Sequence, residues 1–214
     1  MPRASSTLLF GGTFDPPHLA HVELPMLVAD EIACDEVVYI PAAINPLKSD
    51  APPTPKAHRL AMLEIALRDQ SRARISTIEL EREGPSYFVD TLEQLIELEE
   101  AAGDAGDRPS GGRRFLIGAD QALQFHRWRN WERILELAEP VVMLRPPWEE
   151  ADFHAALADA GLDEEAREAW MRRIVIAPIR DIDSTSIREL LREGRDASHL
   201  LDRAVLAYNH QHGL

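Results

Sequence analysis

The chain has 214 residues, of which 45% are hydrophobic and 28% charged, as in an ordinary globular protein, so we expect a single domain over residues 1–214. Its 37 acidic residues outnumber its 23 basic residues and give a formal net charge of -14. This balance argues against a nucleic-acid partner, because a polyanion binds a broad basic surface. The sequence shows no secretory signal, no apolar run of membrane length and only one cysteine, so we expect a cytoplasmic protein without a membrane partner.

Residues 7–21 predict a strand, a tight turn and the start of a helix. The apolar run at 7–10 is typical of a buried strand, and a helical pattern begins near His18. Gly11 and Gly12, which follow the strand, let the backbone approach an anion closely because neither has a Cβ. A phosphate group binds well at such a junction, where free N–H groups meet a helix N-terminus. His18 and His21 share one face and one end of the predicted helix, so both imidazoles point toward the same ligand.

The two histidines also have simpler explanations. A His-x-x-His pair occurs in zinc sites, and it also occurs as two unrelated surface side chains. Zinc normally needs three or four protein ligands, and neither the lone Cys34 nor the other histidines form a partner motif. The sequence therefore predicts no metal ion held by protein ligands alone.

Further apolar runs alternate with helical patterns along the chain. Such alternation predicts an α/β fold, a Rossmann-like doubly wound and mostly parallel sheet with helices on both faces. The later strands are expected at 36–40, 74–80, 114–117, 140–144 and 174–176. The later helices are expected at 58–68, from a turn at 84–86 to about 101, over an acidic and solvated stretch at 149–172, and in closing helices over about 184–212.

Several basic and acidic residues lie where predicted strands end, the edge at which open α/β sheets bind ligands. Lys48 lies in a proline-rich loop at 41–55 and, taken alone, is best explained as an isolated surface lysine. Asp120 either caps a helix or accepts hydrogen bonds from a ribose. Arg145 is suited to bind a phosphate, and a surface ion pair explains it equally well.

Residues 183–191 begin a helix that is rich in hydroxyl groups. Ser186 and Glu189 have the spacing of a capping box, and Ser184 or Thr185 is an alternative N-cap. A plain cap explains these side chains without a ligand. Arg188, in the first turn, favours an anion site instead.

Trp128 and Trp131 are three residues apart and would share one face if this segment is helical. Two tryptophans usually belong to a core. The neighbours of Trp128 are polar, however, and such surroundings suit a partly exposed ring on which a ligand stacks.

Residues 7–21 resemble the GxFDPxHxGH signature of the nucleotidyltransferase superfamily, with Ala20 in place of the second-last glycine. Together with residues 184–188, this stretch resembles the paired ATP-binding motifs of the adenylyltransferase branch. Further stretches are similar, in the right order along the chain, to the family of bacterial nicotinate mononucleotide adenylyltransferases: residues 85–87, 90–92 and 115–120, Trp128, and residues 145–146.

The resemblance implies an enzyme that transfers AMP from ATP to nicotinate mononucleotide, with Mg²⁺ bridging phosphate oxygens. It implies a catalytic role for His18, His21, Lys48 and Arg188. It implies that ATP is bound by Gly11, Gly12, Thr13, Phe14, Ser184, Thr185, Ser186 and Ile187. It implies that the mononucleotide is bound by Tyr87, Thr91, Asp120, Trp128 and Arg145, with the indole stacked on the pyridine ring.

Three departures from the family pattern leave the choice of substrate open. Phe88 stands where many members have a threonine, Arg129 stands where they have an aromatic residue, and Pro147-Trp148 replaces Gly-Tyr. The alternatives are an adenylyltransferase for nicotinamide mononucleotide or phosphopantetheine, and a nucleotide-binding module without catalysis. The sequence does not decide whether the chain acts alone or as a homo-oligomer.

Overall fold

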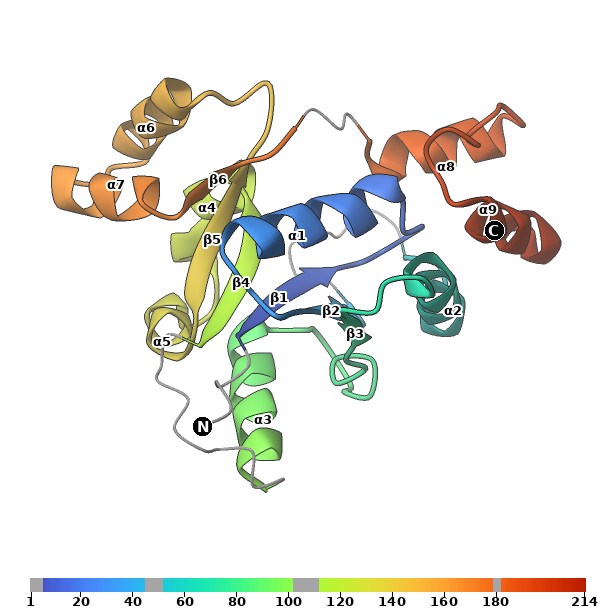
Figure 1. The fold of residues 1–214 in the computed structure, drawn as a ribbon, viewed down its shortest axis with the longest axis horizontal. Coiled ribbons are helices and arrows are strands. Elements are labelled where there is room, and N and C mark those ends of the chain that lie inside the picture. Colours follow the sequence, from blue (N-terminus) through green and yellow to red (C-terminus); the bar gives the residue numbers. More distant parts are fainter. Residues whose placement is uncertain (1–5, 45–51, 102–111, 179–181) are drawn as a thin grey trace.

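Six parallel strands form one sheet in the computed structural model, which describes residues 6–44, 52–101, 112–178 and 182–214 (Figure 1). The order across the sheet is β3-β2-β1-β4-β5-β6, and each pair of neighbours is parallel. The strands are β1 (Thr7–Gly12), β2 (Glu36–Pro41), β3 (Ala73–Ile75), β4 (Arg113–Gly118), β5 (Glu139–Leu144) and β6 (Ile174–Ile176). The predicted single-domain α/β fold with a doubly wound parallel sheet is confirmed.

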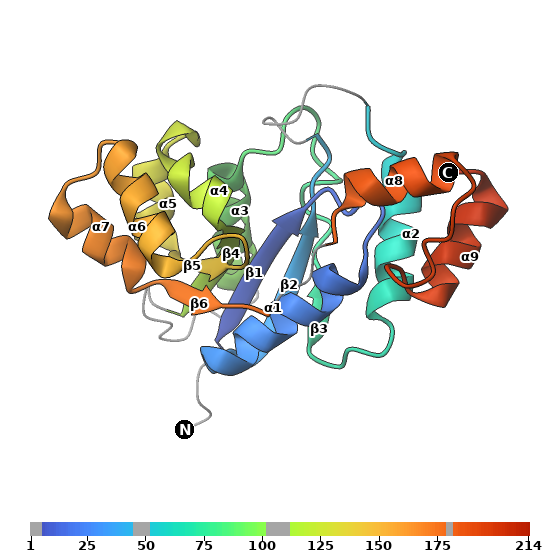
Figure 2. The same cartoon turned by 90° about the horizontal axis from the view of Figure 1, so that it is seen from above.

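Helices cover both faces of the sheet, so both faces are buried. Successive side chains of a strand point to opposite sides and therefore belong to two different cores. Leu8 and Val37 face one core with the helices α1 (Leu19–Glu31) and α2 (Lys56–Leu67). Leu9 and Val38 face the other core, which lies on the opposite side of the sheet (Figure 2). The helices on that side are α3 (Phe88–Ala101), α4 (Ala119–Leu123), α5 (Trp131–Leu137), α6 (Glu150–Asp159) and α7 (Glu164–Met171).

A third apolar cluster attaches the end of the chain to its beginning. The helices α8 (Ser184–Arg192) and α9 (Arg203–His212) lie beside α2, on the right of both views (Figures 1 and 2). Ile187 of α8 and Val205 of α9 are fully buried in one cluster with Leu24 of α1 and Met62 of α2. This packing fixes the start of α8 near the start of α1.

The strand order places the ligand-binding edge between β1 and β4. The chain builds the sheet outward from β1 in one direction, through β2 and β3, and then in the other, through β4, β5 and β6. In open parallel sheets the crevice for a ligand lies at the carboxyl ends of the two strands where this direction reverses. The turn after β1 and the residues after β4 and β5 therefore meet at one edge.

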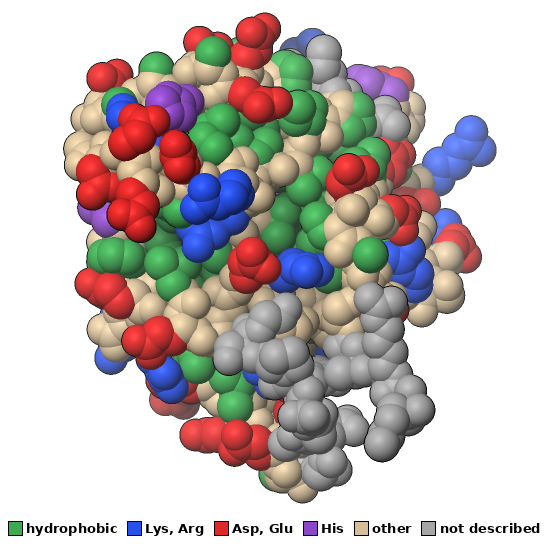
Figure 3. Space-filling view, turned by 60° about the vertical axis from the view of Figure 1, so that its left-hand side comes forward, with side chains coloured by type: hydrophobic (Ala, Val, Ile, Leu, Met, Phe, Trp, Pro, Cys, Tyr) green, Lys and Arg blue, Asp and Glu red, His purple; other side chains and the backbone are tan. Residues whose placement is uncertain are grey.

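Two expectations about local structure were wrong. The strand predicted at 74–80 ends at Ile75; the next residues form a turn in which the Glu81 N–H donates to the Thr77 carbonyl, and Ile78 is buried in that turn rather than in a strand. The acidic stretch at 149–172 was expected to be solvated, but one face of it is buried. The Trp170 ring of α7 packs into the same apolar core as Phe153 and Leu157 of α6. Figure 3, in which this side of the molecule comes forward, shows acidic side chains spread over the surface among hydrophobic and basic ones.

Candidate active site

Gly12 and Phe14 shape the turn that follows β1. Phe14 is buried with a φ of 50°, and its ring centroid lies 5.1 Å from that of His21. A Cβ on Gly12 would lie 3.0 Å from the Phe14 ring, so any side chain at this position would press against that ring and require it to move by a few tenths of an ångström. Gly11 is exposed, and the buried Oγ1 of Thr13 has no hydrogen-bond partner among the described residues. The turn thus presents bare backbone at the edge of the sheet, while the Phe14 ring itself faces the core.

His18 and His21 form a reciprocal pair at the start of α1. His18 is the N-cap, and its Nδ1 accepts a hydrogen bond from the His21 N–H at 3.3 Å. The Nδ1 of His21 accepts from the His18 N–H at the same distance. The two rings are stacked, with centroids 3.5 Å apart and planes 17° from parallel. Because Nδ1 is an acceptor in each ring, the proton of each neutral imidazole lies on Nε2, its outer nitrogen.

His18 is a neutral donor rather than a cation at neutral pH. Its side chain is buried, and this desolvation lowers the pKa of His18 to about 4. The positive charge of Arg145 lowers this pKa further, while the negative charge of Asp183 opposes the shift. Both residues are therefore close enough to His18 to act on its charge, which places the end of β5 and the start of α8 around the imidazole pair.

The start of α8 is hydrogen-bonded directly to the turn after β1. The Ser184 hydroxyl donates to the Pro16 carbonyl at 3.0 Å. Arg188 donates from Nη1 to the Asp15 carbonyl at 2.6 Å and from Nη2 to the Thr185 hydroxyl at 3.2 Å. The two sequence motifs that lie at opposite ends of the chain are thus one surface in the fold.

Asp183, rather than one of the hydroxyl residues, is the N-cap of α8. Its carboxylate accepts from the Ser186 N–H at 2.9 Å and from the Ser186 hydroxyl at 2.7 Å, and these bonds lower the pKa of Asp183. The expected caps at Ser184, Thr185 or Ser186 were wrong, since a carboxylate one residue earlier satisfies the free N–H and complements the helix dipole. The Ile187 side chain is fully buried, so it packs the helix rather than lining the surface.

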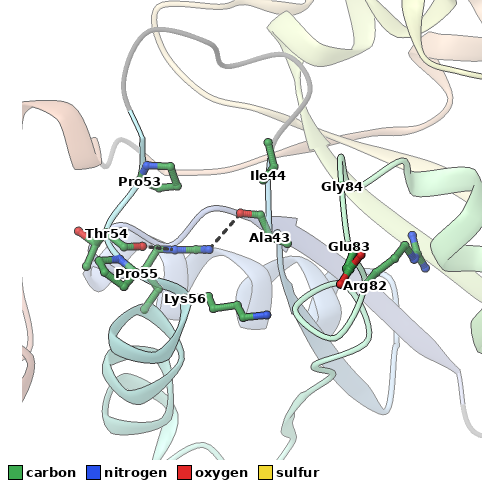
Figure 4. Close-up of a pocket in the computed structure, with 10 residues that line it drawn as sticks. Ala43, Ile44, Pro53, Thr54, Pro55, Lys56, Arg82, Glu83 and Gly84 are labelled. Atoms are coloured by element: carbon green, nitrogen blue, oxygen red, sulfur yellow. Dashed lines mark hydrogen bonds between the residues drawn. The ribbon is translucent and has the colours of Figure 1, made fainter.

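Arg59 is a buried residue that the sequence analysis did not single out. It connects three segments around the turn after β1, which we call the signature turn. Arg59 of α2 is fully buried and donates to the carbonyl groups of Thr13 at 2.6 Å, Thr54 at 2.9 Å and Ala43 at 3.3 Å, the last two drawn in Figure 4. Burial lowers the pKa of Arg59, and the charge of Asp15 opposes this. A cavity of about 340 Å³ opens beside this guanidinium group at the carboxyl end of β2 (Figure 4). An arginine within an amphipathic helical pattern gave no signal of this role.

Trp128 lies in an aromatic cluster beside β4, one of the two strands between which the strand order reverses. Its indole meets Phe88 edge-on at 5.8 Å and lies 5.2 Å from Phe125, and the ring is half-buried. Its Nε1 is buried without a hydrogen-bond partner among the described residues. Trp128 and Trp131 do not share a helical face, because a short 3-10 helix, η1 (Phe125–Arg127), ends before Trp128 and Asn130 adopts a left-handed conformation before α5 begins. The irregular backbone between η1 and α5 therefore orients the two tryptophan side chains independently of each other.

The remaining candidates lie in three different environments. Asp120 is exposed in the first turn of α4, directly after β4, where it is not the helix cap, and Tyr87 is half-exposed just before α3. Thr91 is fully buried, and its hydroxyl donates to Glu79 at 2.8 Å, so its side chain serves the protein interior instead of contacting a substrate. Lys48 lies outside the described residues.

A family model described as cytidylyltransferase-like matches residues 9–190. The match contains the signature turn, both histidines and the first turn of α8. The chain belongs to the cytidylyltransferase-like family.

Curated relatives of this chain are named probable nicotinate-nucleotide adenylyltransferases. The protein of Roseiflexus sp. (strain RS-1) is 35% identical over 208 residues, which are 96% of each chain. The protein of Chromobacterium violaceum is 34% identical over 207 residues, 94% of this chain and 93% of the relative. The recognition of this adenylyltransferase family from the sequence is confirmed, and it is a family of enzymes.

Solved structures of the same fold agree with the topology. Nicotinic acid mononucleotide adenylyltransferase of Plasmodium falciparum, in a complex with NaAD, has a TM-score of 0.68 at 18% identity and covers 98% of this chain and 97% of its own. The same protein complexed with APC has a TM-score of 0.66 at 17% identity, with 98% and 96% covered. At these identities the likeness establishes the fold alone.

Two properties of the described residues bear on ligands and location. They contain no group of three or more His, Cys, Asp or Glu side chains arranged to hold a metal ion. None of their helices is at once long enough and apolar enough to cross a bilayer.

Proposed function

We propose that this member of the family transfers AMP from ATP to nicotinate mononucleotide, giving nicotinate adenine dinucleotide and pyrophosphate in NAD biosynthesis. One observation carries the proposal: the Ser184 and Arg188 side chains of α8 are hydrogen-bonded to the turn that leads into the His18–His21 pair. Donors from both ends of the chain therefore converge at the carboxyl end of β1. A triphosphate carries enough negative charge and enough oxygen atoms to accept hydrogen bonds from several donors at this edge.

The reaction needs positioning and charge neutralisation more than it needs a base. The attacking phosphate monoester has a second pKa near ~6, so it is mostly a dianion at neutral pH. It attacks the α-phosphorus in line, its oxygen forms the new P–O bond, and pyrophosphate leaves with the electrons of the broken bond. No covalent enzyme intermediate is required.

The imidazole pair suits this task as a pair of neutral N–H donors. Because the pKa of His18 is lowered to about 4, its Nε2–H stays in place throughout the physiological pH range. A preorganised donor of this kind stabilises charge that develops on the phosphate oxygens in the transition state. Arg188 has N–H groups that no described residue accepts, since a guanidinium group has five and only two bonds to the described residues use them. It adds positive charge beside the same turn, and we propose the same role for Lys48.

We propose that Mg²⁺ arrives with ATP instead of occupying a site made by the protein. Mg²⁺ keeps several waters and binds readily to substrate phosphates with few carboxylate ligands. When bound, the ion would neutralise charge on the phosphates.

The mononucleotide is proposed to lie on the Trp128 side of the crevice. The half-buried indole offers a flat apolar surface on which the pyridine ring can stack. Arg145, after β5, lies close enough to His18 to affect its pKa and is suited to hold the mononucleotide phosphate between the two subsites. Asp120, exposed after β4, is proposed to accept hydrogen bonds from the ligand.

We also propose a cytoplasmic location, because a chain with a single cysteine suits a reducing compartment.

Product analysis tests the proposal. Purified protein is incubated with Mg·ATP and nicotinate mononucleotide, and both the dinucleotide and pyrophosphate are quantified, with EDTA as the metal control. Equal amounts of the two products are expected, and EDTA should abolish both. Pyrophosphate without dinucleotide would identify a hydrolase of ATP. Faster pyrophosphate release in a parallel assay with phosphopantetheine in place of the mononucleotide would assign the alternative transferase.

A further inference from the structure

The guanidinium group of Arg129 is held beside Trp128 by two weak contacts. Its Cζ lies 4.7 Å from the centroid of the Tyr87 ring, and its Nη1 lies 3.5 Å from Oδ2 of Asp90. The side chain is 53% exposed. Arg129 thus extends from the segment after η1 across to the start of α3, where Tyr87 and Asp90 lie.

These two contacts are too weak to explain Arg129 as a residue that stabilises the fold. A half-exposed ion pair stabilises a fold little, and 3.5 Å is longer than the distance of a strong charge-assisted hydrogen bond. The helices α3 and α5 are already connected by a similar pair, Arg133 with Glu93 at 3.4 Å. The Tyr87 ring attracts the guanidinium group without accepting a directed hydrogen bond from it, so this contact leaves N–H groups for another acceptor.

The acid and amide forms of the pyridine substrate have nearly the same size and differ by one negative charge. A pocket can separate two such ligands only through electrostatics and hydrogen bonding. Around Trp128 the described neighbours are mainly aromatic, and the carboxylate of Asp90 lies at the rim. Without Arg129, that carboxylate would repel an acidic ligand and favour the amide.

We propose that Arg129 selects the carboxylate form of the pyridine nucleotide, and that Asp90 sets how much of its charge reaches the ligand. This rests on the proposed function, which places the pyridine ring on Trp128. Arg129 directly follows Trp128, and its guanidinium group lies against Tyr87, the neighbour of the Phe88 ring that meets the indole edge-on. A planar guanidinium group matches a carboxylate with two parallel N–H donors and has no such match with an amide.

The test is the ratio of kcat/KM for nicotinate mononucleotide to kcat/KM for nicotinamide mononucleotide. Arg129→Gln is expected to lower this ratio about tenfold by weakening the use of the acid, with the KM for ATP unchanged. Arg129→Lys keeps the charge but loses the fork and should fall between. Asp90→Asn releases the guanidinium group from its partner and should raise the ratio several-fold. Arg133→Gln removes an exposed ion pair of similar length between α5 and α3, and it should leave the ratio as it is.

Each outcome decides one claim. An unchanged ratio in Arg129→Gln, or an equal loss for both substrates, would overturn the role of Arg129 while leaving the adenylyltransferase activity intact. Equilibrium binding of the two mononucleotides, followed by tryptophan fluorescence, gives a second ratio that needs no turnover. A tenfold fall in the binding ratio without any dinucleotide formation would support Arg129 and refute the proposed function.

Discussion

His18 offers a quantitative test of how the site is built, through the pH dependence of stability. His18→Asn removes the titrating group while keeping a short polar acceptor at the N-cap of α1, where asparagine is favoured. The wild-type imidazole is buried, and its pKa is lowered from 6.5 to about 4 in the folded protein. We expect the variant to lose less stability than the wild type when the solution is acidified.

The sign follows from where the proton binds. Above pH 6.5, the ordinary pKa of histidine, the group is neutral in both states and contributes nothing to the pH dependence. As the pH falls from there toward about 4, the unfolded chain binds a proton that the folded protein does not, so the stability of the wild type falls. Between about pH 7 and about pH 5 this shift predicts a loss of about 2 kcal/mol from His18 alone.

Urea denaturation of both proteins at these two pH values measures the effect. The fall in unfolding free energy should be smaller in His18→Asn than in the wild type by about 2 kcal/mol. His126→Asn, at an exposed histidine, controls for the loss of an imidazole in general. Equal losses in the wild type and His18→Asn would show that His18 titrates as a free histidine, and the argument from burial would fail.

Three further predictions concern activity and packing. His18→Ala or His21→Ala should each lower kcat about 10²-fold, as the loss of one preorganised donor does; an unchanged kcat in both, measured by pyrophosphate release, would remove them from the mechanism. Trp128→Ala should raise the KM for the mononucleotide about tenfold while Trp128→Phe retains most of the stacking, and a rise in the KM for ATP instead would place the indole in the wrong subsite. Arg59→Met should lower the unfolding free energy by about 3 kcal/mol in urea, since three carbonyl groups lose their donor. Arg68→Met, at an exposed arginine of the same region, should change it little, and a similar fall in both would refute a special role for Arg59.

The sequence predicted the sheet and the two motifs at its edge because each depends on local patterns. Apolar runs such as residues 7–10 and 36–40 could only be buried strands, and the glycines and histidines that follow the first run have a specific order. The pairing of the N-terminal motif with residues 184–188 was expected only through the family resemblance, and the bond from Ser184 to the Pro16 carbonyl was not predicted, since nothing local in either segment specifies a partner so distant in sequence.

What sequence reasoning missed depends on tertiary contacts. Arg59 lies in an ordinary amphipathic helix pattern, and only the folded chain shows that its guanidinium group is surrounded by three carbonyl groups. Thr91 was interpreted as a substrate contact, but the fold buries it against Glu79, whose pKa is raised by burial. The cap of α8 was assigned to a hydroxyl because the serines are conspicuous, whereas Asp183, one residue earlier, is the stronger acceptor.

The most direct test of the central claim offers both pyridine mononucleotides to the wild-type protein in one mixture with Mg·ATP. Mass spectrometry of the products identifies which dinucleotide forms, and pyrophosphate is measured in parallel. We expect nicotinate adenine dinucleotide as the dominant product, in an amount equal to the pyrophosphate released. Formation of neither dinucleotide would contradict the proposed function, and a dominant amide product would contradict the substrate assigned to it.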